Sequence, residues 1–160
     1  MREYLFHGKR LDNGEWVEGF LVENEDDVYR AFIVSSARWE VDADGDTDLM
    51  ETQVFEVDPE TVGQFTGLAD QKGNRAFTDS VIRYSGEYGH IAYGVVCFGE
   101  IPPVVGVNAD HIGFYIEWQN DGANMWNEWW RNDLKYWLAE SLCEIIGNRW
   151  DNPELLEGVS

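Results

Sequence analysis

The chain has 160 residues, of which 31 are acidic and 11 are basic, and its formal net charge is −20 at pH 7. This charge argues against a general nucleic-acid-binding protein and against docking on anionic lipid, because both need clustered Lys and Arg. Trp, Tyr and Phe make up 14% of the chain, whereas disordered acidic chains contain few aromatic residues. We therefore expect one folded domain over residues 1–160.

Short apolar segments separated by polar turns predict strands in the first half of the chain. These predicted strands cover residues 4–7, 16–22, 28–34 and 54–57. Asn13-Gly14 favours a tight turn after the first strand, and Gly19 marks a predicted irregularity inside the second. Asp58, followed by Pro59, predicts a short capped helical turn, which Gly63 and Gly67 keep short.

Residues 35–52 lack a clear periodicity and contain four aspartates at alternate positions from Asp42 to Asp48. We expect a long acidic loop here, inserted between two strands. Carboxylates at this spacing resemble a calcium-binding loop, but such loops need Gly at the sixth position and Glu at the twelfth. Counted from Asp42, these positions hold Thr47 and Gln53. The segment therefore predicts a solvated loop rather than a metal site.

The second half of the chain continues the β pattern after a turn at residues 72–74. Further strands are predicted over residues 81–85, 91–98, 112–118 and 142–146. One amphipathic helix is predicted over residues 124–140, where large apolar side chains recur at spacings of three and four. Asn152-Pro153 opens a last helical turn. Frequent short strands with glycine-rich turns favour an antiparallel barrel or sandwich.

No catalytic, cofactor or metal motif stands out in the sequence. His7, His90 and His111 are scattered, and glycines match neither the phosphate-loop nor the dinucleotide spacing. Cys97 and Cys143 lie in apolar segments and are expected to be buried free thiols, although one disulfide between them is an alternative. We therefore expect no enzyme, no cofactor and no metal.

The first eight residues lack a long apolar core and a cleavage site, and no apolar segment reaches the length of a membrane span. A cytoplasmic protein is therefore expected.

Trp129 and Trp130 are adjacent in the predicted helix and point about 100° apart, so at least one of them is a candidate contact residue. Trp16, which follows a turn, is a third candidate; the simplest alternative for the tryptophans is a helix that faces the core.

Three blocks of the sequence resemble the YopX family of phage and prophage proteins. They are REYLFHGKRLDNGEWVEG at residues 2–19, VDPETVGQFTGLAD at 57–70 and IIGNRWDNPELL at 145–156. The resemblance implies a mainly β fold, with a small SH3-like barrel, and an origin in phage or prophage with activity in the bacterial cytoplasm. It implies no reaction and no catalytic residues. Family members usually have Gly-Asp where this chain has Asp79-Ser80, so any binding by that pair is in doubt here.

Two functions are compatible with these patterns. The first is a non-enzymatic accessory protein that binds a host or phage protein through aromatic and acidic surface; a sharper version is an acidic decoy for a nucleic-acid-binding host protein. The alternative is a small-ligand or carbohydrate-binding module that uses exposed tryptophans. Strand edges and exposed Trp also predict self-association into a homo-oligomer.

Overall fold

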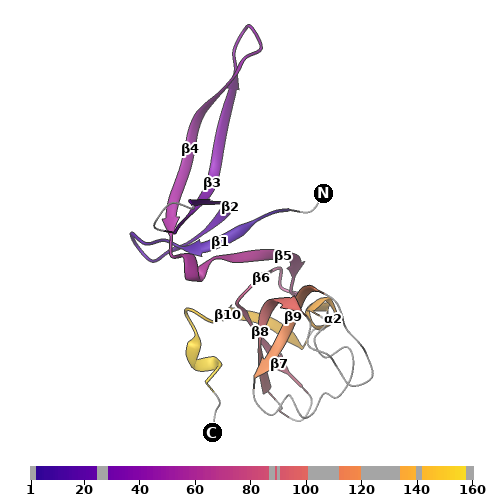
Figure 1. The fold of residues 1–160 in the computed structure, drawn as a ribbon. Helices are drawn as coiled ribbons and strands as arrows, with labels where there is room; N and C mark the ends of the chain where they lie inside the picture. Colours follow the sequence, from indigo (N-terminus) through magenta and orange to yellow (C-terminus); the bar gives the residue numbers. More distant parts are fainter. Residues whose placement is uncertain are drawn as a thin grey trace. The chain divides into compact units, whose positions relative to one another are not determined.

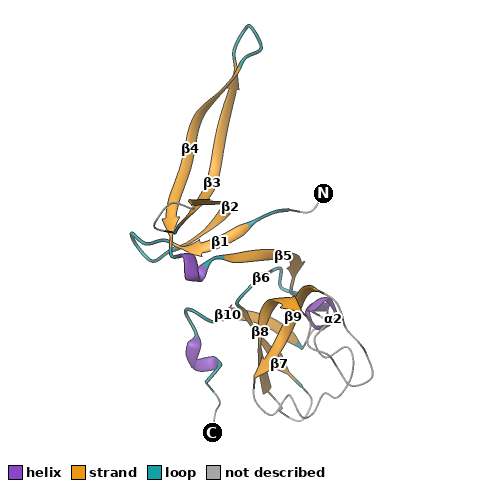
Figure 2. Ribbon diagram, viewed as in Figure 1, coloured by secondary structure: helices purple, strands orange, loops and turns teal. Residues whose placement is uncertain are grey.

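The computed structural model describes residues 3–24, 29–86, 89, 91–100, 112–119, 134–139 and 142–157. Most of these residues lie in strands (Figure 2), which confirms the mainly β fold class. The strands form two antiparallel sheets, and no closed barrel is found among the described residues, so the SH3-like barrel is not confirmed. The chain divides into two compact units, Met1–Phe65 and Thr66–Ser160. The single domain predicted over residues 1–160 stays a prediction, since compactness and independent folding are different properties.

The first unit is built from four strands and a short helical turn (Figure 1). They are β1 (Phe6–Lys9), β2 (Trp16–Asn24), β3 (Arg30–Val41), β4 (Thr47–Val57) and the 3-10 turn η1 (Pro59–Thr61). The strand order is β4-β3-β2-β1-β5, where β5 (Gly63–Ala69) begins in this unit and ends in the next. Gly14 has φ 73°, as a tight turn between β1 and β2 requires, so the turn predicted at Asn13-Gly14 is confirmed.

The acidic loop predicted over residues 35–52 is wrong, because this segment forms most of a long hairpin. Strands β3 and β4 pair from Ala31↔Val57 to Val41↔Thr47, and only the tip from Asp42 to Asp46 is a turn. Figure 1 shows the hairpin extending beyond β1 and β2. The described side chains of the far part of the hairpin are exposed on both strands. Exposed positions on a strand need not alternate polar and apolar residues, so the usual strand signal is weak at these described residues.

Gly19 allows β2 to change partners along its length. Residues before it pair with β1, and residues after it pair with β3. A Cβ atom at Gly19 would lie 2.1 Å from the carbonyl oxygen of Val34, a distance that no side chain can adopt. The predicted irregularity at this glycine is therefore a close approach of two backbones.

A small core and one polar tie hold the first unit together. Ala31, Ile33 and Val57 are fully buried and pack with partly buried apolar neighbours, which are Phe6, Val17, Leu21 and Val62. The predicted capped turn is confirmed at η1, where the Asp58 side chain accepts a hydrogen bond from the Glu60 N–H at 3.1 Å. Thr61, also buried, accepts a hydrogen bond from the Lys9 N–H at 2.9 Å and so joins η1 to β1.

The second unit contains the end of β5, a short strand β6 and a four-stranded sheet. The additional strands are β6 (Arg75–Phe77), β7 (Ser80–Ser85), β8 (Ile91–Glu100), β9 (Ile112–Gln119) and β10 (Cys143–Asn148). In the four-stranded sheet the order is β10-β7-β8-β9. The predicted strands over 81–85, 91–98 and 112–118 are confirmed within a few residues. Strands β5 and β6 were not predicted, because Gly63 and Gly67 favour a turn over a strand.

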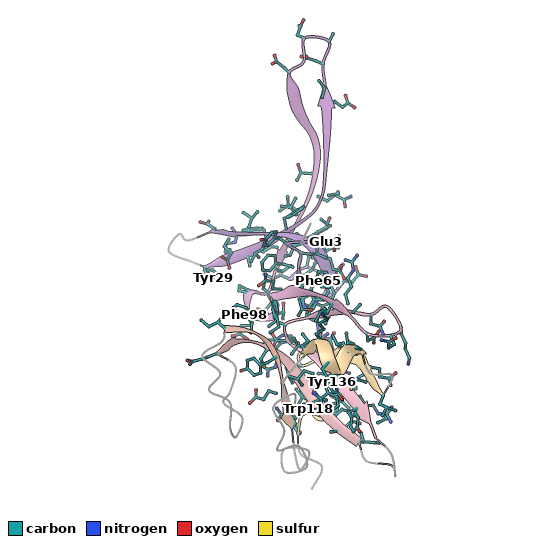
Figure 3. All side chains as sticks on the ribbon, turned by 90° about the vertical axis from the view of Figure 1, so that its right-hand side faces the viewer. Glu3, Tyr29, Phe65, Phe98, Trp118 and Tyr136 are labelled. Carbon is teal, nitrogen blue, oxygen red and sulfur yellow. The ribbon has the colours of Figure 1, made fainter. Side chains whose placement is uncertain are left out.

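Aromatic side chains fill the core of the second unit. Helix α2 (Leu134–Ala139) buries Leu134, Trp137 and Leu138 against one face of the sheet, so the described part of the helix predicted over 124–140 is confirmed as core-facing. The Trp137 ring lies 5.2 Å from that of Trp118 on β9, in edge-to-face geometry. Figure 3 shows Trp118 close to helix α2, which carries Tyr136. Residues 124–133 lie outside the described residues.

The chain closes on a 3-10 turn, η4 (Pro153–Leu155), as the Asn152-Pro153 pair predicts. Asn152 makes no side-chain cap hydrogen bond to this turn. Its amide oxygen lies instead where a Cβ atom of Gly147 would be, 2.0 Å from that ideal position. Gly147 on β10 is thus needed to make room for the Asn152 side chain.

Candidate functional site

The first unit exposes an apolar sheet face that we call the outer face. It consists of five side chains on three adjacent strands, namely Phe20, Val22, Phe32, Val34 and Val54. Directly paired residues of antiparallel strands lie on the same side, and the registers Phe20↔Val34, Val22↔Phe32 and Val34↔Val54 therefore place all five together. Phe20 is 65% exposed, whereas Ile33 on the opposite face is fully buried. The sheet thus has a covered face and an open apolar face.

A salt bridge borders the outer face at one end. The Arg30 guanidinium donates two hydrogen bonds to the Glu56 carboxylate, each 2.7 Å long. The same guanidinium lies over the Phe32 ring, 5.0 Å from its centroid. The hydrogen bond from Arg30 and, to a lesser extent, its positive charge lower the pKa of Glu56, so the carboxylate is ionised at neutral pH. Arginine stacked on an aromatic ring and paired to a carboxylate gives this end of the face a fixed shape.

The three tryptophans predicted as contact residues have different outcomes. Trp16 is half-buried on β2, and its ring lies 4.7 Å from that of the buried His7. Trp129 and Trp130 lie outside the described residues. The outer face was not predicted, although all five of its residues lie in predicted strands, because only the cross-strand register brings them together. The alternation of Phe20 with Val22 and of Phe32 with Val34 is the signal that the sequence carries.

Asp79 lies in the tight turn between β6 and β7, and Ser80 is the first residue of β7. Asp79 has φ 69°, a left-handed conformation that glycine adopts most easily and that Asp tolerates. The buried Ser80 hydroxyl accepts a hydrogen bond from the Phe77 N–H at 2.9 Å, a bond that a carboxylate at this position can accept equally well. In this chain the pair closes a turn.

Asp79 also takes part in a small group of polar side chains of the second unit. Its carboxylate lies 3.3 Å from the Arg149 guanidinium, and burial raises its pKa more than this cation lowers it. On β8, the Cys97 thiol lies 3.7 Å from the Glu117 carboxylate. Burial, followed by the Glu117 charge, raises the pKa of Cys97 to about 11. A thiol that stays protonated at neutral pH is a poor nucleophile, so this group does not provide an activated cysteine.

Both cysteines are free, with Cys143 buried and Cys97 half-buried, which confirms free thiols and excludes the disulfide alternative.

Within the described ranges, no group of three or more His, Cys, Asp or Glu side chains is arranged to hold a metal ion. At the hairpin tip, the Asp42 carboxylate accepts hydrogen bonds from the backbone N–H groups of Asp44 and Asp46. His90 and His111 lie outside the described residues.

Asp70 is a buried carboxylate whose four hydrogen bonds all serve the structure. One oxygen accepts bonds from the N–H groups of Lys72 and Asn74, and the other from the Asn74 amide and the Ile145 N–H. Burial alone would raise the pKa of Asp70, but these hydrogen bonds outweigh it and lower the pKa. The carboxylate therefore ties the predicted turn at residues 72–74 to strand β10.

These features define a mainly β protein with an open apolar sheet face, in which the carboxylates of Asp58 and Asp70 stabilise turns. None of the described helices is long and apolar enough to cross a membrane.

The chain belongs to the YopX family, whose model, described as YopX protein, matches residues 21–157. Among solved structures, the chain is similar to the crystal structure of protein EF1440 from Enterococcus faecalis. The TM-score is 0.58 at 15% identity, over 98% of this chain and 100% of that one. Such a likeness shows a shared fold. Among curated proteins, none matches the chain.

Proposed function

We propose that this YopX-family chain is a non-enzymatic accessory protein of phage or prophage origin that binds a host or phage protein in the bacterial cytoplasm. The observation that supports this proposal is the outer face, where Phe20, Val22 and Val54 are each at least half exposed on paired strands. A contiguous exposed apolar patch is typical of a protein–protein contact site. The protonated Cys97 thiol and the structural role of Asp70 are in line with a function without catalysis.

The test is recovery of a partner from a bacterial lysate by tagged full-length protein. Wild type is compared with a variant in which the outer face is changed. Phe20→Ser removes the most exposed ring of the face. Tyr4→Ser is the matched control, because Tyr4 is exposed to the same degree, 64% against 65%, and lies outside the face. We expect the same partner with wild type and Tyr4→Ser and at least about tenfold less with Phe20→Ser. Equal recovery by all three proteins contradicts the proposal, as does the recovery of no partner at all.

The alternative of a carbohydrate-binding module has less support among the described residues. Trp118 and Trp137 are buried in the core, and Trp16 packs on His7. Trp150, just above one-third exposed, is the most open tryptophan for which the structure gives a burial. Quenching of tryptophan fluorescence by a panel of glycans would favour this alternative over protein binding.

A further inference from the structure

The hairpin beside the outer face has an open backbone edge. Strand β4 is the end strand of its sheet, and along residues 47–55 its one described strand neighbour is β3. On its other side, contacts are found at the base, where Arg10 bridges Val57 and the Leu11 N–H donates to the Glu56 carbonyl. An open edge presents backbone donors and acceptors to which a further strand can pair. Val54 lies on this edge strand and belongs to the outer face, so the edge and the apolar side chains are continuous.

The charge around this surface is strongly one-sided. The described residues of the first unit include fourteen Asp and Glu but four Lys and Arg. At the tip of the hairpin, Asp42, Asp44 and Asp46 are all exposed. Opposite charges on neighbouring strands stabilise a sheet, whereas like charges destabilise it. The chemistry of the surface therefore favours a basic occupant.

We propose that hairpin β3–β4 binds an extended basic segment of a partner protein, which pairs as a strand with the open edge of β4 and places alternate apolar side chains on the outer face. This inference rests on the proposed function and adds the chemical class of the partner. The residues that recognise it are Phe20, Val34 and Val54 for apolar side chains and the hairpin carboxylates for Lys or Arg. Main-chain pairing gives affinity, and alternate side chains give specificity.

A second copy of this chain is a poorer occupant of the same edge. Pairing two hairpins would bring two strongly acidic surfaces together, and juxtaposed like charges disfavour association. Self-association through the outer face is therefore an outcome that the test must detect, by sedimentation of wild type and of Val54→Ser.

The probe is a dye-labelled ten-residue peptide of alternating Lys and Val, titrated with the full-length protein and followed by fluorescence anisotropy. One control peptide has Glu in place of Lys, and a second keeps every Lys but has Pro in place of Val, which prevents strand pairing. We expect the Lys-Val peptide to bind most tightly and its affinity to fall as salt is added. The double variant Phe20→Ser/Val54→Ser should bind it at least about tenfold more weakly than wild type, whereas Tyr4→Ser should not change the affinity.

Three results overturn the inference: equal binding of the Lys-Val and Lys-Pro peptides, equal binding by wild type and the double variant, or a dimer of wild type that Val54→Ser dissociates. Hydrogen exchange provides a second readout, since pairing should slow exchange of β4 amides in residues 49–55. If no peptide binds but a lysate partner still depends on Phe20, the proposed function stands and this inference fails. If Phe20 matters in neither experiment, both fail.

Discussion

Asp79 is a residue whose side chain and backbone have opposite requirements. Its positive φ favours glycine, while its carboxylate forms an ion pair with a partly exposed Arg149. Burial of the Asp79 carboxylate offsets part of the attraction to Arg149, so we expect the ion pair to contribute about 1 kcal/mol at most. Relief of a left-handed backbone by glycine is worth about the same. The two effects nearly cancel, which explains how Asp can occupy a left-handed position in this chain.

Substitution of Asp79 tests this balance. We expect Asp79→Gly to change the free energy of unfolding by less than about 1 kcal/mol, whereas Asp79→Val should lower it by about 2 kcal/mol, because a β-branched residue is strained at positive φ. Urea denaturation followed by tryptophan fluorescence measures both values. A large loss in Asp79→Gly would mean that the ion pair with Arg149 matters more than the backbone.

The hydrogen bonds of the buried Asp70 carboxylate lead us to expect that the fold loses stability in acid. Its hydrogen bonds hold the folded-state pKa below the ordinary value of 3.8, so ionised Asp70 stabilises the fold at pH values above about 3.8. That stability is lost as the pH falls through the lower folded-state pKa. Asp70→Asn cannot accept all four hydrogen bonds and should lower the free energy of unfolding at pH 7 by about 1–3 kcal/mol.

The same variant should also lose less stability than wild type when the pH is lowered below 3.8. Chemical denaturation at a series of pH values gives the change in the free energy of unfolding with pH for wild type and for Asp70→Asn. Asp44→Asn, at the exposed hairpin tip, is the control for the loss of one negative charge. Parallel pH curves for wild type and Asp70→Asn would show that the Asp70 hydrogen bonds do not favour its ionised form.

At the scale of elements, strand β10 and the turn η4 are fixed by the packing of Asn152 against Gly147. A methyl group at Gly147 would overlap the Asn152 amide oxygen, and overlaps of this kind cost about 1–3 kcal/mol. Gly147→Ala should therefore destabilise the protein, and Asn152→Gly added to it should restore part of the loss, as a double-mutant cycle would show. Purely additive effects in thermal unfolding would contradict direct contact between these two residues.

The elements that sequence reasoning predicted correctly are those with one buried face. In β7, β8 and β9, apolar residues such as Ile82, Val96 and Ile116 face the core and mark the strands. Where burial does not impose a pattern, prediction failed. The side chains that the structure describes in the far part of hairpin β3–β4 are exposed on both strands, and β5 contains two glycines, one of which has φ 85°. The outer face was missed with them, since recognising it requires the cross-strand register, which a sequence pattern does not provide.

At the scale of the whole molecule, we expect the net charge of −20 to lower the stability of the folded state. Repulsion among carboxylates destabilises a compact state and is screened by salt. We expect the Tm to rise by about 3–6 °C between 10 mM and 500 mM NaCl, which corresponds to about 1–2 kcal/mol for a chain of this size. Differential scanning fluorimetry measures this directly.

A variant of the hairpin tip separates charge repulsion from other salt effects. Asp44→Asn/Asp46→Asn removes two exposed carboxylates, so its Tm should exceed that of wild type in 10 mM NaCl and converge with it in 500 mM NaCl. A Tm of wild type that falls as salt is added would mean that its salt bridges outweigh the repulsion.

The open edge of β4 has a practical consequence for handling the protein. An unpaired edge next to exposed apolar side chains is a template for aggregation, and charged residues along it act as gatekeepers that keep copies apart. These gatekeepers are carboxylates, and the isoelectric point of the sequence is about 4.2. Near that pH the protective charge disappears while the edge and the outer face remain. Clarification, chromatography and storage of this protein should therefore stay well above pH 5, where its own acidity keeps it dispersed.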